Sequence, residues 1–77
     1  LSDAMRVYPS VTTDVLTVET PTAGGEYAVY NMTGAQVAAG EIDGYKTDIN
    51  VSSLVPGTYI LRYMHSDGVG VKTFIKK

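Results

Sequence analysis

The chain has no cysteine and no tryptophan among its 77 residues, and it has one histidine and one phenylalanine. Many small secreted domains use disulfides to support a thin core, but here packing alone must hold the fold together. A chain of this length buries roughly 60–65% of the surface that its unfolded form exposes, so we expect marginal stability. Its hydrophobic content of 44% is enough for one compact core. We therefore expect a single domain over residues 1–77.

The sequence also lacks a strong excess of positive or negative charge, and it has no long apolar run. The net charge is −2, and acids and bases are interspersed along most of the chain, which argues against the basic face of a nucleic-acid-binding protein. No apolar run approaches the ~20 residues that cross a bilayer, and no signal peptide is recognisable. The chain starts at Leu1 rather than at a methionine. We read it as a piece of a larger protein, so the missing signal says nothing about export.

What the sequence does contain is a series of short strand patterns. Glycine and proline interrupt the chain every dozen residues or so, and no window shows an apolar repeat at helical spacing. Between the interruptions lie Val, Ile, Thr and Tyr, which suit a pleated, half-buried surface. Seven strands are predicted: Arg6–Tyr8, Val15–Thr20, Glu26–Asn31, Gln36–Ile42, Tyr45–Val51, Thr58–Met64 and Val69–Lys76.

The turns between these strands favour antiparallel pairing. Asp43–Gly44 and the spacing from Asn31 to Gly34 are typical of tight hairpins. We expect Gly34 to supply the positive φ of a type I turn with a bulge. Seven short strands at this spacing predict an all-β fold, a seven-stranded antiparallel β-sandwich of immunoglobulin-like type.

The stretch "PGTYILRY" near the end of the chain predicts which side of one strand is buried. Period-two alternation places Tyr59, Leu61 and Tyr63 on one face, which is the more apolar face and therefore the inward one. We expect the Tyr59 hydroxyl to reach a backbone group, as in a tyrosine corner. Gly57 gives the preceding turn its conformational freedom. Arg62 then points outward.

The last strand carries apolar residues on both of its faces. We expect Val69, Val71, Thr73 and Ile75 to point inward, which leaves Phe74 outside between Lys72 and Lys76. A large ring flanked by lysines suits a docking surface. The alternative is that Lys72, Lys76 and Lys77 only keep an edge strand from pairing with other molecules.

The motifs, in their order along the chain, resemble those of the type A C-terminal sorting domains of the type IX (Por) secretion system. The resemblance covers "VYPS", "DVLTVET", "YAVYNMTGAQV", "INVSSLVPGTYILRY" and "VKTFIKK". Where that family usually has Asn-Pro after the first proline, this chain has Ser10 and Val11. The positions that match are Tyr8, Pro9, Leu16, Val18, Tyr30, Asn31, Gly34, Leu54, Gly57, Tyr59, Leu61, Arg62, Lys72, Lys76 and Lys77.

The resemblance implies a secretion signal rather than an enzyme. Such a domain directs an N-terminal passenger protein from the periplasm across the outer membrane, so the passenger ends at the cell surface or is secreted. The implied partners are the type IX translocon, an outer-membrane shuttle protein and a sortase-like transpeptidase, which in this family usually removes the signal and attaches the passenger to the surface. Whether this domain is cleaved or retained stays open. Recognition by translocon and shuttle is expected at Lys72, Lys76 and Lys77, supported by Arg62 and Phe74. The family positions Tyr8, Pro9, Gly34, Gly57, Tyr59 and Leu61 are expected to be mainly structural.

Catalytic and metal sites find little support in the sequence. His65, Ser66 and Asp67 are consecutive turn residues, whereas a catalytic triad assembles across a pocket. Acidic residues such as Asp43 follow no known spacing of metal ligands, and an acid beside a glycine suits a turn. We therefore predict no catalytic residue, no metal and no cofactor.

Two other functions and one assembly stay open at this point. A carbohydrate-binding or fibronectin-like accessory module of a secreted enzyme would use exposed tyrosines such as Tyr27, Tyr30 or Tyr45 to stack on sugars. A purely structural spacer domain is the third possibility. A homodimer through an uncovered edge strand is also possible, because such an edge offers unpaired backbone groups.

Overall fold

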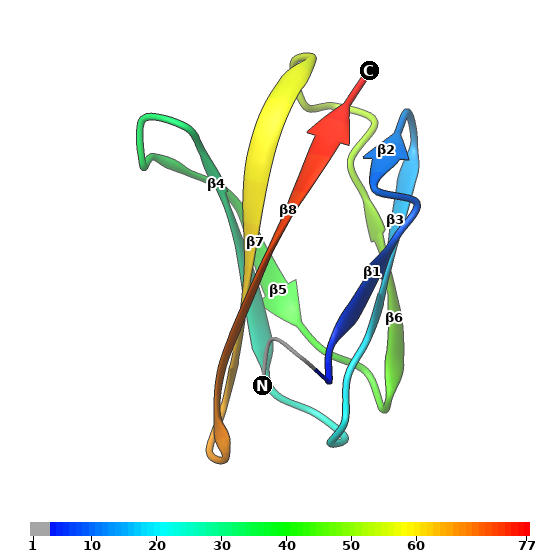
Figure 1. The fold of residues 1–77 in the computed structure, drawn as a ribbon, viewed down its shortest axis with the longest axis vertical. Helices are drawn as coiled ribbons and strands as arrows, with labels where there is room; N and C mark the ends of the chain where they lie inside the picture. The colour runs from blue at the N-terminus through cyan, green and yellow to red at the C-terminus, as the bar shows by residue number, and fades with distance from the viewer. Residues whose placement is uncertain (1–3) are drawn as a thin grey trace.

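A computed structural model describes residues 4–77, and all regular structure in this part of the chain is β-strand. The strands form two sheets that lie face to face as two layers (Figure 1). One sheet has three strands in the order β1-β3-β6, and the other has five in the order β2-β8-β7-β4-β5. The strands are β1 (Arg6–Tyr8), β2 (Val11–Thr12), β3 (Val15–Glu19), β4 (Glu26–Asn31), β5 (Gln36–Glu41), β6 (Lys46–Asn50), β7 (Gly57–His65) and β8 (Gly68–Lys76).

All seven predicted strands are present, and each end lies within one residue of its predicted place. The prediction of seven strands, all antiparallel, is nevertheless wrong, because β2 adds an eighth that pairs in parallel with the end of β8. Its two residues are too few to show an alternation. The chain crosses from one sheet to the other between β1 and β2, which brings these two residues beside the end of β8. The Ile75 N–H then donates to the Ser10 carbonyl, at 2.8 Å.

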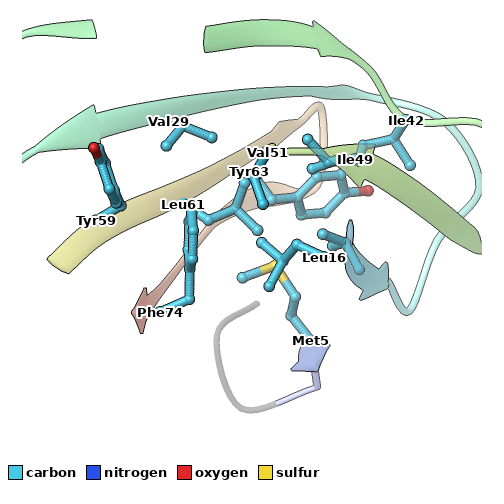
Figure 2. Close-up of a cluster of buried hydrophobic side chains, with 11 residues drawn as sticks. Met5, Leu16, Val29, Ile42, Ile49, Val51, Tyr59, Leu61, Tyr63 and Phe74 are labelled. Atoms are coloured by element: carbon cyan, nitrogen blue, oxygen red, sulfur yellow. The ribbon is translucent and has the colours of Figure 1, made fainter. Parts of the chain in front are cut away.

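The core lies between the two sheets and draws on both of them (Figure 2). The three-stranded sheet contributes Leu16 and Val18 from β3 and Ile49 from β6, all at most 3% exposed. The other residues of the core cluster are Met5, Val29, Ile42, Val51, Tyr59, Leu61, Tyr63 and Phe74. With no disulfide, burial of these side chains is the main stabilising contribution to the fold.

Strand β7 confirms the orientation that alternation predicted. Tyr59, Leu61 and Tyr63 are at most 6% exposed, and Arg62 points to solvent. The Tyr59 hydroxyl donates to the carbonyl of Val55, four residues earlier, so the predicted bond to the backbone is present. The Tyr63 hydroxyl reaches the loop before β4, where it donates to the Gly24 carbonyl at 3.0 Å. Both rings therefore bury apolar surface without leaving a hydroxyl unpaired.

Strand β8 has the opposite orientation to the predicted one. Phe74 is 1% exposed and stacks on the Tyr59 ring, with centroids 5.6 Å apart, whereas Val71 and Ile75 are each 45% exposed. Tyr59 lies directly opposite Phe74 in the antiparallel pair. Residues that lie opposite each other point to the same side of a sheet, so an inward Tyr59 forces Phe74 inward as well. The larger number of apolar residues on the other face does not decide the orientation.

The turn between β4 and β5 forms as predicted. Gly34 has a φ of 89°, and its N–H donates to the Asn31 carbonyl at 3.0 Å. The Asn31 side-chain oxygen also accepts hydrogen bonds from the N–H groups of Thr33 and Ala35. Asn31 and Gly34 are thus explained by the turn that they stabilise.

Candidate recognition surface

Within residues 4–77 no pocket opens on the protein, and no three His, Cys, Asp or Glu side chains come together. His65 stacks on the Tyr63 ring and bonds to its neighbours in the β7–β8 turn. Its Nδ1 accepts the Asp67 N–H at 3.0 Å and lies 3.6 Å from the Asp67 carboxylate. This local geometry matches the turn interpretation of these residues.

The lysines of the last strand do not form the outward strip that we predicted. Lys72 is half-buried and lies opposite Leu61, so it shares the inward face of β8 with Phe74. Lys76 is 8% exposed, and its Nζ donates to the Lys77 carbonyl at 2.8 Å. Its aliphatic stem is buried while its ammonium group stays hydrogen-bonded at the rim of the sandwich. The prediction that Phe74 and Lys76 are exposed is therefore wrong. Lys77 and Arg62 are exposed, as predicted.

The family positions have structural explanations in this fold. Tyr8 donates a hydrogen bond to the Glu19 carboxylate, which ties β1 to β3. This bond raises the pKa of the Tyr8 phenol above its usual value of 10.0. Tyr59 and Leu61 belong to the core. Gly57 begins β7 with a φ of 158°, close to extended backbone.

The outer face of the three-stranded sheet is polar and internally paired. Arg6 and Lys46 lie on either side of Glu19 in neighbouring strands, and the Arg6–Glu19 ion pair measures 3.9 Å. The Thr17 hydroxyl donates to Asp48 at 2.7 Å across the next rung. Opposite charges alternate across the strands, as in the solvated face of an ordinary sandwich.

The outer face of the five-stranded sheet is mainly apolar. Val69, Val71 and Ile75 are 44–45% exposed and share the outer face of β8 with Thr73. Ile60 and Met64 continue the surface on β7, and Arg62 lies between them, opposite Val71 on one side and Ala28 on the other. Sequence reasoning missed this face because it placed the β8 valines in the core. The available signal was the apolar character of both faces of β8.

The tyrosines considered for sugar stacking lie on different surfaces. Tyr27 packs against the core cluster, Tyr30 lies on the outer face of β4, and Tyr45 is 63% exposed in the β5–β6 connection. Tyr27 and Tyr30 have opposite parity on one strand, so they face opposite sides of the sheet. No shared stacking platform forms among these three rings.

The fold and its surfaces define a small β-sandwich domain with no pocket in the described residues. The chain belongs to the family described as "Secretion system C-terminal sorting domain", whose sequence model matches residues 6–77. It is a sorting domain of type IX secretion, as its motifs predicted. No curated protein and no solved structure matches it. No helix in the described residues is long and apolar enough to span a membrane.

Family membership has direct consequences. A sorting tail of this kind interacts with the type IX secretion machinery and is preceded by a passenger region. It leads to export, either to the cell surface or into the medium. Sorting tails are generally not catalytic.

Proposed function

We propose that this domain carries a passenger protein, N-terminal in the same polypeptide, from the periplasm across the outer membrane through the type IX translocon. A sortase-like transpeptidase then removes the domain and attaches the passenger to the cell surface. The domain itself performs no catalysis. The observation that carries this proposal is the family match over residues 6–77.

Recognition of a folded surface is the mechanism. The described residues form a packed sandwich with a buried core and no pocket, so a shuttle protein has only side chains on the outer surfaces to read. Arg62 and Lys77 are the exposed cations that we propose as contacts, together with the half-buried Lys72. Lys76 and Phe74 act indirectly, because they hold β8 in place.

We assign the sandwich to the immunoglobulin-like type. In support, three strands (β1, β3 and β6) face a sheet in which β8, β7 and β4 are neighbours. The chain changes sheets between β1 and β4 at every step and again on either side of β6, whereas β4–β5 and β7–β8 are hairpins within one sheet. Such crossings between sheets occur in Greek-key sandwiches. The buried Tyr59, whose hydroxyl bonds to a carbonyl four residues upstream, resembles the tyrosine corner of that type.

Strand β5 is the edge through which we propose that a second copy pairs. It is the outermost strand of its sheet, and its only charged residue is Glu41 at its end, so most of the edge lacks the charged residues that usually protect such strands. The outer strands β1 and β6 carry Arg6, Lys46 and Asp48. Sedimentation at rising concentration tests this pairing: a dimer that Ala39→Pro abolishes supports it, and a monomer throughout refutes it.

A reporter protein fused ahead of the domain tests the export function. In a bacterium with a type IX secretion system, we expect the wild-type fusion at the surface or in the medium. A fusion without Lys76 and Lys77 should stay in the periplasm. This deletion leaves Phe74 in the core, so it disturbs the fold less than removal of all of β8. Normal surface display of the shortened fusion would contradict the proposed role of the terminal lysines.

A further inference from the structure

The two outer faces of the sandwich differ in kind, although both belong to one small domain. On the three-stranded sheet, cross-strand neighbours compensate one another's charge, as Arg6, Glu19 and Lys46 do. On the five-stranded sheet, Val71 and Ile75 are each 45% exposed. A solvated sheet face normally carries polar side chains, and a contiguous apolar face marks an interaction surface.

The apolar side chains of the five-stranded sheet lie on adjacent strands, with Thr58, Arg62 and Thr73 among them. Val71 lies opposite Arg62, Met64 lies opposite Val69, and Thr58 lies opposite Ile75. Strand β2 extends the surface, because Val11 lies beside Ile75 and is 40% exposed. On the other side Ile60 lies opposite Tyr30 of β4. We call this surface the β8 face: Val11, Tyr30, Ile60, Arg62, Met64, Val69, Val71 and Ile75.

The charges around the β8 face indicate what it binds. Arg62 is its only cation, and within residues 4–77 it makes no ion pair. At the end of the face nearest the β7–β8 turn, Glu26 and Glu41 lie directly opposite each other, again without an ion pair in that range. Like charges in this position destabilise a sheet. An arginine surrounded by apolar side chains is the typical centre of a protein interface.

We infer that the β8 face is the docking surface for a component of the export machinery, an inference that rests on the proposed function. The partner is a protein with an apolar surface. It presents a carboxylate to Arg62 and, about 7 Å further along the strand direction, a basic side chain to Glu26 and Glu41. The apolar contact supplies the binding free energy, and the two charge contacts fix the orientation.

The reporter fusion, with substitutions confined to one face, tests this inference. Val71→Thr combined with Ile75→Thr removes apolar surface but keeps the β-branched shape. Arg62→Glu reverses the central charge. The control is Val15→Thr on the opposite sheet, because Val15 is also 45% exposed. Each purified domain is melted first, and midpoints within about 4 °C of wild type show that the fold is intact.

We expect the double threonine variant and Arg62→Glu each to lower surface reporter about tenfold or more, with the reporter retained in the periplasm. Val15→Thr should be exported like wild type. Equal export of the β8-face variants and the wild type would overturn the docking surface and leave the proposed function standing. Retention of the wild-type fusion would overturn the proposed function and, with it, this inference. If the midpoint of the double threonine variant falls by more than about 4 °C, its export is not interpreted, and the export of Arg62→Glu alone tests the docking surface.

Discussion

Replacing Phe74 by alanine separates a core role from a contact role for this residue. Its side chain is 1% exposed and stacks on Tyr59 between the two sheets. Truncation of a buried Phe costs about 3–5 kcal/mol, from lost transfer free energy and the cavity that remains. A domain of this size has a total stability of about 4–12 kcal/mol. Phe74→Ala should therefore remove a large part of the free energy of unfolding.

The assay is urea unfolding, followed by circular dichroism and tyrosine fluorescence, together with thermal melting. At about 4–8 °C for each kcal/mol, the midpoint of Phe74→Ala should fall by about 12–40 °C. Ile75→Ala is the matched control. Ile75 follows Phe74 on the same strand, but its side chain faces outward and is 45% exposed. It should change stability by no more than about 1 kcal/mol.

The outcome that refutes this reasoning is a Phe74→Ala domain as stable as Ile75→Ala. If such a stable variant also failed to be exported, Phe74 would be the exposed contact that the sequence suggested. If export of Phe74→Ala is lost together with stability, the residue acts through the fold, as its burial indicates.

The remaining predictions concern glycines, hydroxyls and pH, each measured by urea midpoints. At Gly25, with a φ of 106°, a Cβ would lie 2.7 Å from a carbonyl oxygen, so Gly25→Ala should cost about 3 kcal/mol or more. Gly24→Ala, with a φ of 79° and open space, should cost about 1–2 kcal/mol, and equal midpoints would contradict this difference. Tyr63→Phe should cost about 1–2 kcal/mol, because the Gly24 carbonyl loses a buried donor, and an unchanged midpoint would exclude that contribution. The folded-state pKa of Tyr8 is raised above 10.0 by its bond to Glu19. The stability advantage over Tyr8→Phe should therefore persist below pH 10 and disappear as the pH rises further, and a loss below pH 9 would contradict it.

Local information in the sequence was sufficient to locate the strands. Period-two alternation, and glycines that allow a positive φ, act over a few residues and do not depend on distant parts of the chain. Seven of the eight strands, the turn at Gly34 and the inward orientation of Tyr59 could therefore be predicted from the sequence. The order of the motifs was also sufficient to identify the family, because the motifs are spread over nearly the whole chain.

The tertiary structure alone decided the orientation of β8 and the character of the two outer surfaces. Both faces of β8 carry apolar residues, so alternation leaves two solutions, and the pairing of Phe74 with Tyr59 selects one. That selection buries Phe74 and Lys76 and exposes Val71 and Ile75. The contact surface that we propose is therefore built from valine and isoleucine around Arg62 rather than from lysines. Strand β2 likewise exists only because the end of β8 offers backbone groups to it. Register couples residues on two strands, and the alternation within either strand alone does not record it.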